Sequence, residues 1–158
     1  MGHDRELRSS RMTSPHVYDK AKYHVETVEA HGLPEEHASN HTVFFLRWLI
    51  EHDLTSKSFV EEMGGDFEQY RAGKKSIHDL YNDWWDCCLV DDMLSEEGNG
   101  FAMEYFDFEN GKYLNDYTGL LQGTLPSEYH IRYTEENYAR MKKVIYKRYI
   151  EWKSGRPR

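Results

Sequence analysis

The chain has 158 residues, of which 39% are hydrophobic, 15% aromatic and 30% charged, and its formal net charge is −8. This length suits a single domain, and the aromatic content excludes a disordered chain and predicts a core built largely of rings. No apolar run approaches the roughly 18 residues of a membrane-spanning helix, and no apolar stretch follows the charged first residues as it would in a secretory signal.

We predict three parts along the chain. Residues 1–16 are expected to be a flexible N-terminal arm or a vector leader, with a native start at Met12. Residues 17–154 are expected to form a single helical domain, and residues 155–158 a tail. Because the apolar spacing is mostly helical, the predicted fold is mainly α: a compact single-domain bundle of five to seven helices with at most a short extended segment.

A long helix is predicted to start at residues 33–36 (LPEE). The proline suits a first helical turn, and the two glutamates face the positive end of the helix dipole. The helix is expected to continue to Asp53. Its wide apolar stripe predicts the central helix of the core, with Ala38, His41, Phe44, Phe45, Trp48, Leu49 and Ile50 on it.

Two short helical segments are predicted next, at residues 55–63 and 67–73, and each ends at glycine. A capping-box pattern at residues 76–79 then opens another helix. Its apolar face is expected to hold Ile77, Leu80, Tyr81, Trp84 and Cys88.

The stretch DWWDCCLVDD, residues 83–92, is the most unusual part of the sequence. Helical spacing turns Asp83 and Asp86 toward water and leaves Trp85 at the boundary between the wet and the apolar face. The stretch therefore predicts a buried aromatic wall with an acidic rim.

Cys87 and Cys88 are the two cysteines of the chain, and they are adjacent. They match neither a CxxC redox motif nor a zinc motif, so we interpret them as two small buried thiols. With no disulfide framework, a reducing cytoplasm is the expected location.

Ser95 is predicted to cap a helix that runs through Tyr105. The Asn110-Gly111 pair after it suits either the turn of a β-hairpin or the turn between two helices. The helical spacing of the apolar residues in 113–121 favours the two helices.

The alternation of large residues at 129–133 predicts one short extended segment. Thr134 then caps a last helix that ends at Gly155. This helix is basic, and we interpret its charge as a solvated face or an internal neutraliser of acidic residues rather than as a nucleic-acid site.

Charge is distributed unevenly along the chain. Residues 76–118 hold 11 acidic residues and one lysine, a net charge of −10, whereas residues 132–158 hold nine basic and three acidic residues, a net charge of +6. The middle of the chain therefore predicts an acidic face that repels nucleic acid and attracts a basic protein, apart from any charge that the last helix cancels.

The nine histidines suggest a metal site. His37 and His41 lie four residues apart on the predicted central helix, and His24 or His52 could join them with an aspartate from residues 83–92. The sequence contains no HExxH motif, however, and His41 on the apolar stripe also suits a buried polar anchor. His24, His37 and His41 are therefore weak metal candidates.

No other catalytic arrangement is indicated. The neighbouring acids Asp91-Asp92 and Glu96-Glu97 suit a solvated rim, because adjacent side chains point in different directions. No GxSxG motif and no phosphate-binding glycine loop occurs. We therefore predict no enzyme activity, no catalytic residue and no cofactor.

Several motifs resemble those of a known family. They are YDKAKYH (18–24), GLPEEHASNHTVFFLRWLIEHDL (32–54), LVDDMLSEEGNGFAMEYFD (89–107), YLNDY (113–117) and YTEENYARMKKVIYKRYIEWK (133–153). In these motifs the chain resembles a family of small bacterial cytoplasmic proteins described as a domain of unknown function. We associate such small acidic proteins with polymorphic bacterial toxins, so the resemblance implies an immunity protein.

The sequence thus predicts an immunity or antitoxin-like protein, a monomer or weak homodimer, that binds and blocks a cognate basic toxin domain. Neither nucleic acid nor a membrane is an expected partner. The alternative is a metal-dependent hydrolase that uses His and Asp residues. The predicted partner-binding residues are an aromatic anchor and six acids: Asp83, Trp85, Asp86, Asp91, Asp92, Glu96 and Glu97.

Overall fold

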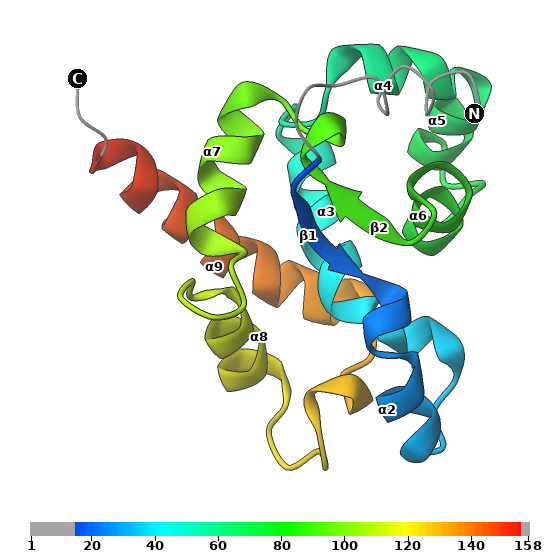
Figure 1. Cartoon of the computed structure of the whole chain (residues 1–158), viewed down its shortest axis with the longest axis vertical. Coiled ribbons are helices and arrows are strands. Elements are labelled where there is room, and N and C mark those ends of the chain that lie inside the picture. The colour runs from blue at the N-terminus through cyan, green and yellow to red at the C-terminus, as the bar shows by residue number, and fades with distance from the viewer. Residues whose placement is uncertain (1–14, 156–158) are drawn as a thin grey trace.

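The computed structural model describes residues 15–155, which form eight α-helices and one small sheet (Figure 1). The helices are α2 (Val25–Ala30), α3 (Asn40–Glu51), α4 (Lys57–Met63), α5 (Gly65–Arg71), α6 (Ile77–Trp85), α7 (Glu96–Tyr105), α8 (Tyr113–Leu121) and α9 (Glu135–Ser154). The prediction of a mainly α fold is confirmed, with more helices than the five to seven expected. The predicted arm and tail lie almost wholly outside the described residues.

Four short 3-10 turns and two strands complete the described chain. The turns are η1 (Ala21–Tyr23), η2 (Glu35–Ala38), η3 (Asp91–Met93) and η4 (Glu128–His130), and the strands are β1 (Val17–Lys20) and β2 (Cys88–Val90). The predicted extended segment at 129–133 begins instead inside η4, and only from Ile131 onward is the backbone extended.

Helix α3 lies in the middle of the molecule, and ten of its 12 residues are buried (Figure 1). Helices α6 and α9 both pack against it. The predicted central helix is confirmed, but it begins at Asn40 because Pro34 is extended and residues 35–38 form the separate turn η2. None of the helices formed by residues 15–155 has the length and apolarity that crossing a membrane requires.

The core is built largely of rings, as predicted. Phe45 of α3 stacks on Phe106 with 4.7 Å between ring centroids, and it contacts Tyr113 at 5.5 Å. Phe101 and Trp48 extend the same cluster at 5.6 Å from each other. Such offset and edge-on aromatic pairs stabilise a core beyond the area that they bury.

The strands β1 and β2 pair antiparallel, although they lie far apart in the sequence. The register shifts between Val17 and Asp19, and the successive residues Tyr18 and Asp19 are both buried. In a regular strand successive side chains point to opposite faces, so this irregularity lets both point inward. It also brings the Asp19 carboxylate into the interior.

Helix α6 begins at the capping box that the sequence predicted at Ser76 and Asp79. It ends at Trp85, because Asp86 and Cys87 take left-handed backbone conformations with φ of 52° and 54°. The chain then enters β2, so Cys88 does not continue the helix. Both cysteines are partly exposed and form no disulfide, so the prediction that they are buried was wrong.

The two tryptophans of α6 are placed the opposite way from the prediction. Trp85 is fully buried, with its ring 4.7 Å from the ring of Phe59 in α4. Trp84 is half-buried, and its Nε1 donates a hydrogen bond of 2.9 Å to Asp66. Trp85 is therefore a core residue and not an aromatic anchor for a partner. Its burial comes from α4 packing against α6, which the periodicity of α6 alone does not reveal.

The turn between α7 and α8 confirms the helix–turn–helix prediction for the Asn110-Gly111 pair. A Cβ atom on Gly111 would collide with the backbone carbonyl oxygens of Tyr105 and Asp107. Glycine is therefore required here by space.

Candidate functional site

The acidic residues predicted to bind a partner lie at three places. Asp83 and Asp86 are exposed, on α6 and at its end. Asp91 and Asp92 are partly buried in η3. Glu96 and Glu97 occupy the first turn of α7. The six predicted acids thus come from three successive elements of the chain.

Helix α9 neutralises part of the acidic middle of the chain. Glu97 accepts a hydrogen bond from the Tyr149 hydroxyl, and one of its oxygens lies 3.5 Å from Nζ of Lys153. Arg148 donates two hydrogen bonds of 2.9 Å to the two oxygens of Asp116. The basic last helix thus acts at these points as the internal neutraliser considered from the sequence.

Another group of exposed carboxylates forms around a pocket of about 450 Å³ between α6, η1 and η2. Its lining includes acids from two distant parts of the sequence, together with Lys22, Ser39 and His78. We call these acids and the exposed Asp83 of α6 the acidic surface, which consists of Glu35, Glu36, Asp79, Asp83 and Asp86.

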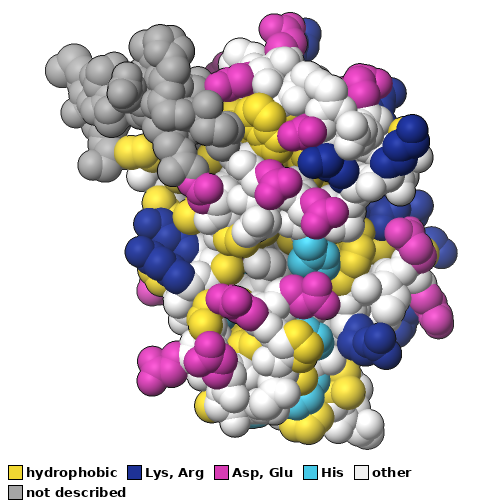
Figure 2. All heavy atoms as spheres, turned by 90° about the vertical axis from the view of Figure 1, so that its right-hand side faces the viewer, with side chains coloured by type: hydrophobic (Ala, Val, Ile, Leu, Met, Phe, Trp, Pro, Cys, Tyr) yellow, Lys and Arg dark blue, Asp and Glu magenta, His cyan; other side chains and the backbone are white. Residues whose placement is uncertain are grey.

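Figure 2 shows acidic side chains distributed down the middle of this side of the molecule, with lysines and arginines mostly toward its edges. Besides Lys22, Lys75 reaches into the region, with its Nζ 3.8 Å from Asp83 and 3.3 Å from Asp66. The sequence assigned Glu35 and Glu36 only to a helix start. Their membership in the acidic surface follows from tertiary packing and had no local signal.

The predicted metal pair of His37 and His41 does not form. His37 lies in η2, and its Nδ1 is 2.6 Å from the backbone oxygen of Tyr129. His52 instead stacks on Trp48, with 4.3 Å between ring centroids. The i,i+4 geometry is absent because α3 starts at Asn40, after His37.

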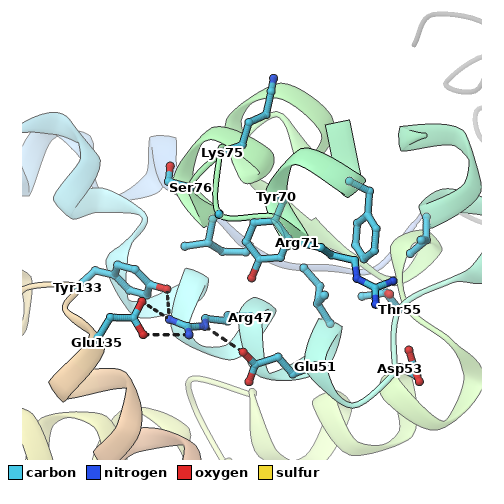
Figure 3. A pocket seen from close by; sticks show the side chains of 15 residues that line it. Arg47, Glu51, Asp53, Thr55, Tyr70, Arg71, Lys75, Ser76, Tyr133 and Glu135 are labelled. Atoms are coloured by element: carbon cyan, nitrogen blue, oxygen red, sulfur yellow. Dashed lines mark hydrogen bonds and ion pairs between the residues drawn. The ribbon is translucent and has the colours of Figure 1, made fainter. Parts of the chain in front are cut away.

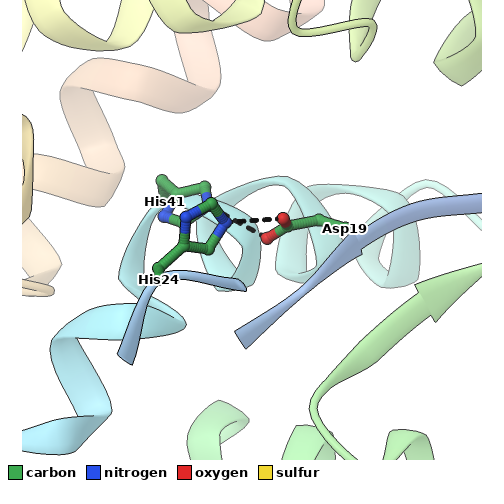
Figure 4. A group of neighbouring side chains, drawn as sticks. All are labelled: Asp19, His24 and His41. Carbon is green, nitrogen blue, oxygen red and sulfur yellow. Dashed lines mark hydrogen bonds and ion pairs between the residues drawn. The ribbon is translucent and has the colours of Figure 1, made fainter. Parts of the chain in front are cut away.

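His24 and His41 instead meet Asp19, a residue that was not among the predicted metal ligands (Figure 4). Nε2 of His24 lies 2.7 Å from one carboxylate oxygen of Asp19, and Nε2 of His41 lies 3.0 Å from the other. The side chains of Asp19 and His41 are 2% and 5% exposed, and that of His24 is 16% exposed. We call these three residues the Asp–His cluster.

Two further side chains hold the Asp–His cluster in place. The hydroxyl of Thr42 donates a hydrogen bond of 2.7 Å to Asp19, and the hydroxyl of Tyr129 lies 2.9 Å from Nδ1 of His24. Burial opposes the negative charge of Asp19, but the hydrogen bonds with His24 and His41 outweigh it and hold the pKa of Asp19 well below its usual range. Asp19 is therefore a buried carboxylate that stays ionised.

The Asp–His cluster is the group of residues, within 15–155, that could hold a metal ion. One donor atom from each of the three side chains lies within 4.8 Å of the other two. The carboxylate comes from β1 rather than from residues 83–92, where the sequence analysis expected it. The YDKAKYH motif contains both Asp19 and His24, so it was the sequence feature from which this pair could have been predicted.

A larger pocket, of about 740 Å³, surrounds Arg47 of α3 (Figure 3). The guanidinium of Arg47 donates hydrogen bonds to Glu51, Tyr133 and Glu135 at 2.8–3.1 Å. Two carboxylates of the protein thus already compensate its charge. Arg47 therefore links α3 and α9 and is not an uncompensated cation for an anionic ligand in this pocket.

Comparison with known proteins gives one family match. Residues 17–131 match a family described as Domain of unknown function (DUF7832). The matched region includes the motifs at 18–24, 32–54 and 89–107 and ends before α9. No curated protein and no solved structure matches the chain.

Proposed function

The chain belongs to this family of domains of unknown function, and from that premise we propose that it is an immunity or antitoxin-like protein. It binds a basic toxin domain through the acidic surface and blocks it. The observation that carries the proposal is the convergence of four exposed carboxylates around one pocket at α6, η1 and η2, with the exposed Asp83 on the same helix α6.

The electrostatics of the acidic surface suit a basic partner. A concentrated patch of charges of one sign accelerates association with a partner of opposite charge. The pocket between Glu36 and Asp86 has a size that can admit a lysine or arginine side chain. Charge reversal here is expected to slow association more than it affects the folded state.

A toxin domain is the partner that the family resemblance suggests. Many toxin domains act on nucleic acid and carry basic clefts that bind phosphate groups. An acidic protein that occupies such a cleft competes with the substrate by the same electrostatic attraction. Blocking therefore requires no catalytic residue on this chain.

The alternative of a metal-dependent hydrolase depends on the Asp–His cluster. Asp19 and His41 are almost completely buried, and His24 is the most exposed of the three. A substrate would therefore reach a metal there only through the side of His24. Binding through the exposed acidic surface is better supported, because its groups are accessible without any rearrangement.

The test uses two variants with the same change in net charge. In Glu36→Lys/Asp83→Lys the acidic surface is reversed, and in the matched control Glu104→Lys/Glu109→Lys two exposed acids at the end of α7 and in the turn after it are reversed. The tagged protein is purified from its host with its bound partner, the partner is identified, and its association rate is measured. We expect at least about a tenfold slower association for the first variant and little change for the control.

Two results would contradict the proposal. One is an equal loss of rate in both variants, which would indicate a nonspecific effect of net charge. The other is wild-type association by Glu36→Lys/Asp83→Lys in a folded state. If the identified partner is not a toxin, the acidic surface remains the proposed binding site, but the assignment as an immunity protein is wrong.

A further inference from the structure

We propose that Asp19, His24 and His41 bind one divalent metal ion of the zinc class, through one carboxylate oxygen and the two Nε2 atoms. This site is independent of the acidic surface and of the proposed toxin binding. The inference starts from the convergence of three donor atoms from three separate elements: β1, the residue before α2, and α3.

The donor atoms already lie close to the positions that a metal requires. In a tetrahedral zinc site with ligand distances of about 2.0–2.1 Å, neighbouring ligand atoms are about 3.3 Å apart. The carboxylate oxygens of Asp19 lie 2.7 and 3.0 Å from the two histidine nitrogens. These contacts use different oxygens, Oδ1 for His24 and Oδ2 for His41, so the carboxylate has to turn for one oxygen to serve as the ligand. The three donor atoms of the site already lie within 4.8 Å of one another.

The residues around the Asp–His cluster resemble the outer shell of a metal site. A histidine ligand commonly donates its other ring N–H to an oxygen, which fixes the tautomer and the ring orientation. Tyr129 offers its hydroxyl oxygen at 2.9 Å from Nδ1 of His24. The hydroxyl of Thr42 fixes the carboxylate of Asp19 in the same way.

The polar groups at His24 can be satisfied both with and without the ion. Without a metal, Nε2–H of His24 can donate to Asp19 while the Tyr129 hydroxyl donates to Nδ1. With a metal, Nε2 becomes the ligand, and Nδ1 carries the proton and donates to the Tyr129 oxygen. Nδ1 of His24 and the Tyr129 hydroxyl thus exchange donor and acceptor roles when Nε2 becomes a ligand, and both groups keep a hydrogen-bond partner.

The donor types determine the class of metal. Two imidazole nitrogens and one carboxylate suit zinc and its neighbours in the first transition row, whereas magnesium and calcium prefer oxygen ligands alone. Three protein ligands leave a fourth position for water. Of the three side chains, that of His24 is the most exposed to solvent.

The test is a titration of chelator-treated, tag-free protein with Co²⁺, followed by displacement with Zn²⁺. We expect one Co²⁺ per chain with the visible absorption of a low-coordinate site, and loss of that absorption on adding Zn²⁺. His24→Gln and His41→Gln should each weaken binding at least about 100-fold. Tyr129→Phe should weaken it about tenfold, as expected for an outer-shell partner.

A matched control addresses surface histidines. His31 and His130 also face each other, with 5.1 Å between their ring centroids, and His31 is exposed. The variant His31→Ala/His130→Ala should bind Co²⁺ as the wild type does. If this variant loses the ion, the metal sits on the surface and the proposal is overturned.

A second measurement, of the melting temperature Tm, distinguishes loss of metal binding from misfolding of a variant. Zn²⁺ should raise the Tm of the wild type, because an ion that binds only the folded state stabilises it, and it should leave the Tm of folded His24→Gln unchanged. Folded wild type that takes up no Co²⁺ and shows no Tm shift would establish the Asp–His cluster as a hydrogen-bonded core alone. Neither result bears on the acidic surface, whose test is the association rate of the partner.

Discussion

The Asp–His cluster and the acidic surface both depend on carboxylates, but the two regions compensate negative charge in opposite ways. Asp19 is 2% exposed, and its oxygens are occupied by His24, His41 and Thr42. Asp83 is exposed, and Nζ of Lys75 lies 3.8 Å from one of its oxygens. A buried charge has to be compensated inside the protein, whereas an exposed one is solvated and remains available to a partner. The comparison separates a buried carboxylate that stabilises the fold from exposed carboxylates that a partner can reach.

The largest expected effect, and the strongest test of this comparison, is the loss of folding stability when Asp19 is replaced. Asp19→Ala removes the common partner of His24, His41 and Thr42, and leaves buried polar groups without their hydrogen bonds. We expect a loss of about 3–5 kcal/mol in the free energy of unfolding, measured by urea denaturation. The control Asp83→Ala should change it by no more than about 0.5 kcal/mol. Equal effects of the two substitutions would show that Asp19 is not a structural centre.

The difference in the pKa of Asp19 between the folded and the unfolded chain also makes folding stability depend on pH. Its pKa is held well below the usual range in the folded state, whereas in the unfolded chain it returns to about 3.9. Above about pH 4 the stabilisation is fully present. It is lost as the pH falls from there toward the folded-state pKa, because the unfolded chain takes up the proton first.

The measurement compares urea midpoints of the wild type and Asp19→Asn from about pH 6 down to about pH 3. The asparagine has no proton to take up, so the difference between the two proteins should shrink as the pH falls. A constant difference over this range would mean that the charge of Asp19 contributes nothing and that only its hydrogen-bonding shape matters.

Local structure was predictable wherever its cause was local. The capping box at Ser76, the cap at Thr134 and the turn at Gly111 are all confirmed. Each depends on side chains or glycines within a few residues of the element that they define. Helical spacing likewise identified α3 as the central helix.

The failures have a common physical origin in contacts between distant segments. The β1–β2 pair, the burial of Trp85 and the position of Asp19 all depend on which elements pack together. Two of the three histidines named as metal candidates, His24 and His41, do lie in the Asp–His cluster. Their carboxylate partner was assigned to the wrong segment because a single sequence does not show strand pairing.

A smaller effect on folding stability is expected from Asp86, a residue of the acidic surface with an unfavourable backbone conformation. Asp86 ends α6 in a left-handed conformation with φ of 52°, which glycine adopts without strain. We expect Asp86→Gly to raise the free energy of unfolding by up to about 1 kcal/mol while slowing association with the partner. Thermal unfolding and association rates measured on the same preparation would show opposite changes. A loss of stability would mean that the Asp86 side chain outweighs the backbone strain.

The smallest change in folding stability is expected for a substitution of Lys75, a cation at the edge of the acidic surface. Its ammonium pairs at 3.3 Å with Asp66 and at 3.8 Å with Asp83, and both acids have substantial contact with water. Exposed ion pairs contribute little to stability, so Lys75→Met should leave the urea midpoint nearly unchanged. Removing this cation makes the potential around Asp83 more negative, so association with a basic partner should become faster and more sensitive to salt. Slower association would show that Lys75 itself contacts the partner, which would place the binding site nearer to Asp66 and α5 than to the pocket at η2.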